Sequence, residues 1–338
     1  MSATASMSAG AGSRATERLG TGPDDIRRSA SILQAGGLVA FPTETVYGLG
    51  ADGRNAHAVA ALYGAKERPS FNPLIAHLAA AEAALPEGLF DRDALRLAEA
   101  FWPGPLTLVV PVSSKCSVSD LARAGLPTVA LRVPAHPVAS AILAACRFPI
   151  VAPSANRSGR VSPTEAEHVL GDLDRRIDAV VDAGPTRVGV ESTIVACLGN
   201  RTRLLRPGGV ARNAIEGVLG RKLEEVGTVG ARPLAPGALA SHYAPRAAVR
   251  LEAHDVRAGE AALSFGPELP GEAVERLNLS SAGDLTEAAA NLFGYMRRLD
   301  AVRPHAIAVA PIPTIGLGEA INDRLRRAAA ERGPTSSA

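Results

Sequence analysis

The chain has 338 residues, of which 46% are hydrophobic, enough for about two globular domains. Its 36 Lys and Arg residues nearly balance 34 Asp and Glu residues, and the net charge is +2. This balance excludes a protein held to nucleic acid or membrane by bulk charge, because such binding needs a large excess of cations. Any anion that the protein binds must therefore be met by local groups.

Residues 1–22 are rich in Ser, Ala, Thr and Gly and lack the apolar stretch of a secretory signal, so we expect a disordered tail. Arg14 and Arg18 leave an organelle transit peptide as an alternative, and Met7 is an alternative start. Three widely spaced cysteines favour a reducing compartment over a disulfide framework. No apolar run reaches the length of a transmembrane helix, so a soluble protein is predicted, and the cysteines favour the cytoplasm as its location.

Helix-like and strand-like segments alternate from residue 23 to residue 226, which we interpret as one domain. The predicted helices cover residues 23–33, 56–67, 91–101, 138–145 and 164–171. The predicted strands cover residues 38–41, 74–77, 106–112, 129–133, 149–151, 179–181, 193–197 and 203–205. Many short strands favour an α/β domain with a twisted mixed sheet over a regular doubly wound one.

Gly, Pro and Ala dominate residues 227–246 without an apolar period, which predicts a linker or covering loop. Residues 247–338 then predict a smaller α/β domain. Its expected strands cover 248–251, 261–265 and 306–309, and its expected helices cover 284–299 and 317–330. This domain lacks a dense cluster of reactive side chains, so the chemistry is expected in the first domain.

Only three residues are lysine, and one of them, Lys66, stands beside Arg68 where a predicted helix runs into a proline-stiffened loop. An ammonium beside a guanidinium suits several phosphate oxygens. The alternative is a solvated helix C-terminus, where cations favour the helix dipole. In either case both side chains are expected at a loop and not in a core.

Residues 151–159 leave a predicted strand and form a loop of small polar groups that includes Ser154 and Asn156. Loops at strand ends bind ligands in many α/β proteins, whereas a plain helix-capping loop is the alternative. Residues 48–53 match the pattern G-x-G-x-x-G, but they neither follow a strand directly nor open a helix. Turn glycines are therefore favoured, and a nicotinamide enzyme stays an alternative.

Taken together, several segments resemble the YrdC-like threonylcarbamoyl-AMP synthase family in content and order. They are Pro42–Gly50, Lys66–Pro69 with Asn72–Leu74, Trp102–Thr107, and Ser154–Asn156. Pro236-Gly237 and Ser241–Pro245 resemble the long, two-domain form, although Ala238 stands where that form often has Met. The resemblance implies a YrdC-like domain with a basic concave cleft on a twisted mixed sheet, followed by a smaller Rossmann-like α/β domain.

The resemblance also implies a nucleotidyltransferase that joins L-threonine, bicarbonate and ATP into L-threonylcarbamoyladenylate and releases pyrophosphate. That product feeds the N6-threonylcarbamoyladenosine modification at position 37 of ANN-decoding tRNAs. Mg²⁺ is expected with ATP and not at a resident metal site. The expected partner is the downstream tRNA transfer machinery, with tRNA itself held at most transiently.

Carried over position by position, the resemblance implies three groups of site residues. The catalytic group is Lys66, Arg68, Ser154 and Asn156. The ATP-binding group is Lys66, Arg68, Asn72, Thr128, Ala152, Ser154, Ser162, Arg206 and Tyr243. The threonine-binding group is Thr43, Thr45, His77, Arg132 and Ser192. The linker with Ser241, His242 and Tyr243 is expected to close over the cleft as a lid.

Besides the nicotinamide enzyme, two further rival functions remain open. A double-stranded RNA or tRNA binding module would bind RNA with a steep salt dependence and without ATP turnover. A related carbamoyl-adenylating enzyme would use carbamoyl phosphate, although the acylphosphatase and zinc-finger regions of such proteins are missing here.

Overall fold

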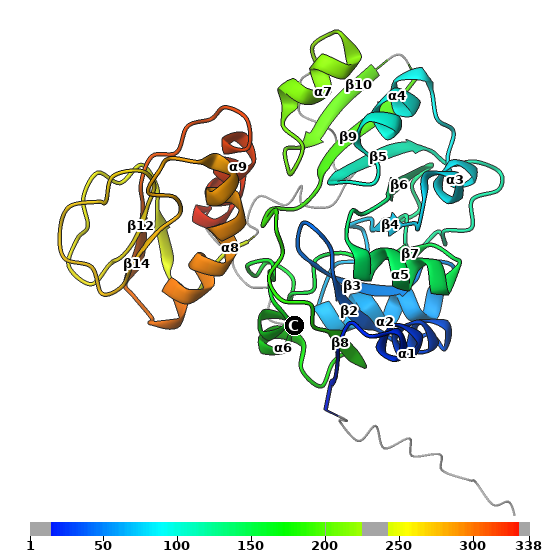
Figure 1. The fold of residues 1–338 in the computed structure, drawn as a ribbon, viewed down its shortest axis with the longest axis horizontal. Coiled ribbons are helices and arrows are strands. Elements are labelled where there is room, and N and C mark those ends of the chain that lie inside the picture. Colours follow the sequence, from blue (N-terminus) through cyan, green and yellow to red (C-terminus); the bar gives the residue numbers. More distant parts are fainter. Residues whose placement is uncertain (1–14, 200, 225–242, 331–338) are drawn as a thin grey trace, which may run out of the picture.

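The computed structural model describes residues 15–199, 201–224 and 243–330, and Figure 1 shows them as a larger and a smaller α/β domain. The expectation of a disordered tail over residues 1–22 is wrong for residues 17–19, which form a strand. Strand β1 (Glu17–Leu19) pairs in parallel with β8 (Ala179–Val181), and Arg18 forms an ion pair of 2.7 Å with Asp182. These partners are far apart in the sequence, so no local pattern predicts the strand. Residues 1–14 lie outside the described part of the chain.

Within the described residues, ten strands form one sheet in the order β1-β8-β2-β3-β7-β4-β6-β5-β9-β10. Besides β1 and β8, the strands are β2 (Val39–Pro42), β3 (Tyr47–Asp52), β4 (Ile75–His77), β5 (Leu106–Pro111), β6 (Thr128–Arg132), β7 (Ile150–Val151), β9 (Thr193–Leu198) and β10 (Arg201–Arg206). The sheet contains both antiparallel pairs, such as β2 with β3, and parallel pairs, such as β4 with β6. The predicted mixed sheet is therefore confirmed.

Helices pack on both faces of this sheet. They are α1 (Pro23–Gln34), α2 (Ala56–Lys66), α3 (Ala81–Ala84), the 3₁₀ turn η1 (Leu85–Glu87), α4 (Arg92–Phe101), α5 (Pro137–Cys146), α6 (Ala166–Leu173) and α7 (Arg212–Leu219). Apolar side chains of α2, α4, α6 and α7 share one core, and those of α1 and α5 share another with the opposite face of the sheet. Neither α1 nor α5 covers the face at β4, β6 and β9, where the polar site described below lies.

Strand β3 corrects the expectation of turn glycines. Gly48 and Gly50 lie inside this strand, which pairs with β2. A Cβ on Gly50 would lie 2.7 Å from the ring of Phe41 and 3.1 Å from the carbonyl oxygen of Val39, so the close approach of β2 requires glycine. Because the G-x-G-x-x-G pattern belongs to a buried strand and opens no helix, it offers no dinucleotide loop.

In the part of the second domain that the structure describes, four parallel strands follow the order β11-β14-β12-β13. Its elements are β11 (Ala248–Arg250), β12 (Ala261–Ser264), β13 (Arg276–Asn278), α8 (Leu285–Ala301), β14 (Ala306–Val309) and α9 (Gly318–Ala329). Both helices pack on one face of the sheet, and apolar loop residues between Ala253 and Leu269 pack on the other. The parallel sheet agrees with the predicted small α/β domain.

The two domains share a core and are joined by ion pairs. Val46, Val161 and Val190 of the first domain belong to the same buried cluster as the apolar residues of α8 and α9. Figure 1 accordingly shows α8 and α9 on the side of the small domain that faces the large one. Arg297 of α8 pairs with Asp172 of α6 at 2.7 Å. The domains are therefore packed against each other through apolar and charged contacts.

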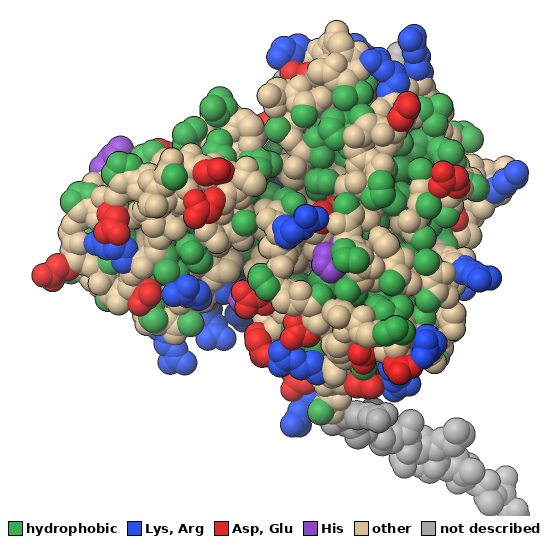
Figure 2. Space-filling view, viewed as in Figure 1, with side chains coloured by type: hydrophobic (Ala, Val, Ile, Leu, Met, Phe, Trp, Pro, Cys, Tyr) green, Lys and Arg blue, Asp and Glu red, His purple; other side chains and the backbone are tan. Residues whose placement is uncertain are grey.

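Surface charge is mixed in sign. Figure 2 shows Lys and Arg side chains interspersed with Asp and Glu, and with apolar groups between them, on the face that it displays. Among the described residues, no helix is both long enough and apolar enough to span a membrane.

Candidate active site

Strand alternation brings two of the predicted polar side chains to the same face of the sheet. On β4 and β6, Ala76 and Leu131 belong to the core under α2 and α4. Because successive side chains of a strand point to opposite faces, His77 and Arg132 project from the other face. Their Cα atoms are partners in the parallel β4–β6 register, so the two side chains are neighbours.

A β-bulge brings Arg206 to this face as well. Leu204 pairs with Val195 and lies in the large core, and Arg206, two residues later, pairs with Ile194. The register shift between Leu204 and Arg206 breaks the two-residue repeat, and such bulges re-aim side chains. The sequence pattern that predicted a strand over 203–205 does not indicate this bulge.

These side chains line a cavity of about 40 Å³ between β4, β6, the loop after β7 and the start of the second domain. Its lining consists of Thr45, Val46, Arg68, Ile75, His77, Arg132, Ala152, Pro153, Ser154, Glu191, Ser192, Arg206 and Tyr243. The volume suits roughly three water molecules, so a larger ligand requires the cavity to widen. The lid residues 227–242 lie outside the described part of the chain, but Tyr243 closes the cavity beside the second domain.

The lining contains many of the predicted site residues but not all of them. Those that meet at the cavity are Thr45, Arg68, His77, Arg132, Ala152, Ser154, Ser192, Arg206 and Tyr243. Those outside its lining are Thr43, Lys66, Asn72, Thr128, Asn156 and Ser162. Of these, Thr128 lies four residues before Arg132, at the opposite end of β6, and it is 9% exposed.

Two buried guanidinium groups at this cavity form no ion pair among the described residues. Arg206 donates to the carbonyl oxygen of Ser192 at 2.8 Å, and Arg68 donates to that of Pro73 at 3.2 Å. The Nε of Arg68 has no hydrogen-bond partner in the described structure. Burial lowers the pKa of Arg68 to about 10, with Arg206 contributing, and burial also lowers the pKa of Arg206. An anion bound between Arg68 and Arg206 would supply a partner for the free Nε and would stabilise the two buried charges.

The expectation that Lys66 lies outside a core is wrong. Lys66 is the last residue of α2 and is 1% exposed. Its Nζ donates to the carbonyl oxygen of Ser154 at 2.5 Å and to that of Asn156. Burial and the charge of Arg68 lower its pKa well below the ordinary value. Lys66 therefore fixes the loop after β7, which carries Ser154 into the cavity. Arg68, expected at the same loop, is also buried at 9% exposure.

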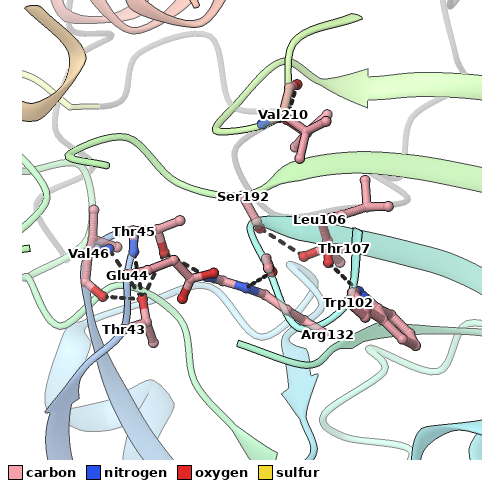
Figure 3. Close-up of polar contacts among 12 residues, drawn as sticks. Thr43, Glu44, Thr45, Val46, Trp102, Leu106, Thr107, Arg132, Ser192 and Val210 are labelled. Atoms are coloured by element: carbon pink, nitrogen blue, oxygen red, sulfur yellow. Dashed lines mark hydrogen bonds and ion pairs between the residues drawn. The ribbon is translucent and has the colours of Figure 1, made fainter. Parts of the chain in front are cut away.

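Arg132 is held by a carboxylate that the sequence reasoning did not single out. Figure 3 shows Glu44 and Arg132 pointing toward each other, and Arg132 Nη2 lies 2.8 Å from Glu44 Oε1. The same nitrogen donates to Thr45 Oγ1 at 3.0 Å, and Thr43 and Thr45 hydroxyls are 2.7 Å apart. The two threonines on either side of Glu44 thus belong to one network that orients Arg132.

Among the buried hydroxyl and amide groups, Ser192 lines the cavity, whereas Thr107, Asn72 and Asn156 lie outside its lining. Ser192 Oγ lies 2.8 Å from Thr107 Oγ1, as Figure 3 shows. Asn156 Nδ2 donates to the carbonyl oxygens of Arg157 and Arg160, whereas its Oδ1 is buried without a hydrogen-bond partner in the described structure. Asn72 Oδ1 is likewise buried without a hydrogen-bond partner in the described structure. Both amide oxygens therefore retain acceptor capacity, although neither asparagine lines the cavity.

His77 is a neutral histidine. Burial lowers its pKa to about 3, and the charge of Arg132 acts in the same direction. Its Nδ1 lies 3.1 Å from the carbonyl oxygen of Ile75, and the backbone of Ile150 also interacts with the ring. A neutral ring can donate or accept a hydrogen bond in the cavity without adding charge.

In addition to Glu44, two residues of the site were not predicted from the sequence. Glu191 lines the cavity, whereas Arg324 of α9 lies outside the lining and contacts Glu191 from the second domain, with its Nε 2.9 Å from Glu191 Oε2. A signal for Arg324 was present, because it interrupts an apolar helix stripe formed by Ile321, Leu325 and Ala328. Nothing in the local sequence indicates that its partner lies on the first domain.

Two models of known protein families match consecutive parts of this chain. A family model for Sua5, YciO and YrdC proteins, described as "Telomere recombination", matches residues 31–208. The chain belongs to the Sua5–YciO–YrdC family. A second model, described as "Threonylcarbamoyl-AMP synthase, C-terminal domain", matches residues 210–330. The predicted resemblance to the long, two-domain form of the family is confirmed.

Members of the Sua5–YciO–YrdC family match nearly the whole chain. The threonylcarbamoyl-AMP synthase of Bacillus subtilis (strain 168) is 40% identical, over 94% of this chain and 96% of that protein. The threonylcarbamoyl-AMP synthase of Pyrococcus abyssi (strain GE5 / Orsay) is 39% identical, over 91% and 94%. The crystal structure of P. abyssi Sua5 complexed with L-threonine superposes with a TM-score of 0.85 at 36% identity and covers 93% of this chain and 97% of that one.

Proposed function

We propose that this chain is an L-threonylcarbamoyladenylate synthase, a nucleotidyltransferase that makes threonylcarbamoyl-AMP and pyrophosphate from L-threonine, bicarbonate and ATP. Its relatives of about 40% identity are named threonylcarbamoyl-AMP synthase, and a structurally similar relative binds L-threonine. The observation that carries the proposal is the pair of buried guanidinium groups of Arg68 and Arg206, which have no carboxylate partner among the described residues.

The reaction requires two bond-forming steps. The neutral amine of threonine attacks the carbon of bicarbonate, which gives a carbamate and water. If the amine instead attacks the carbon dioxide in equilibrium with bicarbonate, the products are the carbamate and a proton. A carbamate oxygen then attacks the α-phosphorus of ATP, and pyrophosphate leaves. Neither step needs a covalent enzyme intermediate, so positioning and neutralisation of charge are the main contributions of the protein.

The cavity residues suit these two tasks. Arg68 and Arg206 would contact the phosphates and stabilise the charge that develops when pyrophosphate leaves. Arg132, oriented by Glu44 and Thr45, would bind the carboxylate of threonine. His77, as a neutral hydrogen-bonding group, and Ser192 would contact the rest of that amino acid.

Magnesium would arrive with ATP as part of the nucleotide substrate. The described residues contain no group of three or more His, Cys, Asp or Glu side chains arranged to hold a metal ion. Glu191 in the cavity lining is already engaged by Arg324 and Ser162. The phosphates would supply much of the coordination of Mg²⁺, which prefers oxygen ligands and retains several waters.

The product would serve the threonylcarbamoyladenosine modification of tRNA, through a downstream transferase in the cytoplasm. A net charge of +2 and the mixed surface of Figure 2 fit an enzyme that releases a small product and does not itself retain tRNA.

The proposal is tested by incubating the full chain with ATP, Mg²⁺, bicarbonate and L-threonine and following pyrophosphate release. We expect release that depends on both threonine and bicarbonate, with threonylcarbamoyl-AMP detected by mass spectrometry. Release that is independent of threonine would contradict the proposal. Tight, salt-dependent tRNA binding without pyrophosphate release would favour the RNA-binding alternative.

A further inference from the structure

The second domain places one arginine against the wall of the cavity. Arg324 of α9 is completely buried. Its Nε donates to Glu191 Oε2 at 2.9 Å, and its Nη1 donates to the carbonyl oxygen of Pro207 at 2.9 Å and to Asp323 Oδ2 at 2.7 Å. Since Glu191 and Pro207 belong to the first domain, the guanidinium crosses the interface between the domains.

The partner of this arginine faces the same space as the phosphate-binding candidates. Glu191 lines the cavity together with Arg68 and Arg206, and its Oε1 accepts a hydrogen bond from Ser162. Burial raises the pKa of Glu191, but Arg324 and then Arg206 more than offset this, so its pKa lies below the ordinary value. Glu191 is therefore a buried carboxylate ion in the wall of the cavity.

A buried anion at this position opposes the binding of a second anion unless a cation neutralises it. Without Arg324, the remaining cation that influences Glu191 strongly is Arg206, the group needed for phosphate. With Arg324 in place, Glu191 has its own partner, and Arg206 donates to Ser192 instead. The docked position of α9 thus determines which charges the cavity presents.

We propose that Arg324 is a positioning residue for the nucleotide: the docked second domain neutralises Glu191 and thereby keeps Arg206 available to the phosphates of ATP. This deepens the proposed function and rests on it for the identity of the anion. Arg324 is not among the lining residues of the cavity, so we place its action on the nucleotide through Glu191.

The molecule offers a matched control at the same interface. Arg212 of α7 pairs with Glu319 of α9 at 2.6 Å, and neither residue lines the cavity. Glu319→Gln therefore removes an ion pair between the domains and leaves Glu191 neutralised. Glu191→Gln removes the carboxylate charge itself with little change in size.

The test is the dissociation constant for MgATP, measured by calorimetry on the full chain. We expect Arg324→Met to weaken binding about tenfold, because a buried charge near the phosphates is no longer neutralised. Adding Glu191→Gln to Arg324→Met should restore affinity to within about threefold of the wild-type value. Arg324→Lys and Glu319→Gln should bind as the wild type does, and Glu191→Gln alone should bind about threefold more tightly.

Two results would overturn the inference: unchanged affinity in Arg324→Met, or weakened affinity that Glu191→Gln does not restore, because a purely structural arginine is not rescued by neutralising its partner. If Arg324→Met does not fold, the single variant Glu191→Gln decides, and weaker binding there refutes the inference. A wild-type chain that binds ATP and follows the rescue pattern but releases no threonine-dependent pyrophosphate would refute the proposed function alone.

Discussion

Lys66 and Arg68 are separated by one residue in the chain but have different environments. Lys66 donates to two carbonyl oxygens of the loop after β7, whereas Arg68 makes weaker contacts and keeps an unpartnered Nε within the described structure. The first side chain therefore contributes to the fold and the second is largely reserved for a ligand. A sequence motif treats them as equivalent, and the structure separates their roles.

Substitution of these residues by methionine should separate stability from turnover. We expect Lys66→Met to lose turnover and also about 1–3 kcal/mol of unfolding free energy, because the carbonyl oxygens of Ser154 and Asn156 lose a buried donor. Arg68→Met should lose turnover with a smaller change in stability, since it removes a buried charge without an ionic partner. Urea unfolding and pyrophosphate release measure the two effects. Equal losses of stability would show that the distinction is wrong.

At the scale of elements, the contact between the loop before β9 and helix α8 depends on one glycine. Gly189 has φ +75°, and a Cβ there would lie 2.2 Å from the carbonyl oxygen of Ala289. Gly184, in the same loop, has φ +75° with nothing within 4 Å of such a Cβ. The pair therefore distinguishes backbone strain from obstruction of the interface between the domains.

We expect Gly184→Ala to cost about 1–2 kcal/mol through its left-handed backbone alone. Gly189→Ala should cost more and should also lower turnover, because α8 must move away from the loop that leads to Glu191 and Ser192. Thermal unfolding and pyrophosphate release measure these effects side by side. If both variants behave alike, the close approach of α8 has no functional importance.

Prediction from sequence succeeded where the signal was local. The helix that begins after Asn55 was predicted from its cap, and Asn55 Oδ1 does accept from the backbone N–H groups of His57 and Ala58. Strand β3 was missed because its glycines have low strand propensity and are required only by the proximity of β2. In the site, motif residues were found, whereas Glu191 and Arg324 meet across 133 positions of sequence and only the tertiary fold brings them together.

For the whole molecule, buried neutral histidines predict how stability depends on pH. Burial lowers the pKa of His77 to about 3 and that of His168 to about 4, with nearby arginines contributing. In the unfolded chain these groups titrate near 6.5. Between these values the unfolded state binds more protons than the folded state, so their contribution to stability is complete above pH 6.5 and declines as pH falls toward the folded values.

Lowering the pH from 7.5 to 5 should therefore destabilise the chain, with His77 alone accounting for about 2 kcal/mol. Urea unfolding at the two pH values measures this difference. His77→Gln should reduce the difference, and His57→Gln, at an exposed position of α2, should leave it unchanged. Stability that is equal at both pH values would contradict neutral burial of these rings.

The core that both domains share has a practical consequence for anyone who wants to divide the protein. A truncated protein that ends at residue 224 would expose Val46, Val161 and Val190 to water and would leave Glu191 without Arg324. Such a fragment would expose a hydrophobic patch close to a carboxylate that has lost its ionic partner. Poor solubility or weak activity of the fragment would then result from the exposed domain interface. Sequence matches that assign each domain separately therefore mark homology and not the limits of an independently soluble unit.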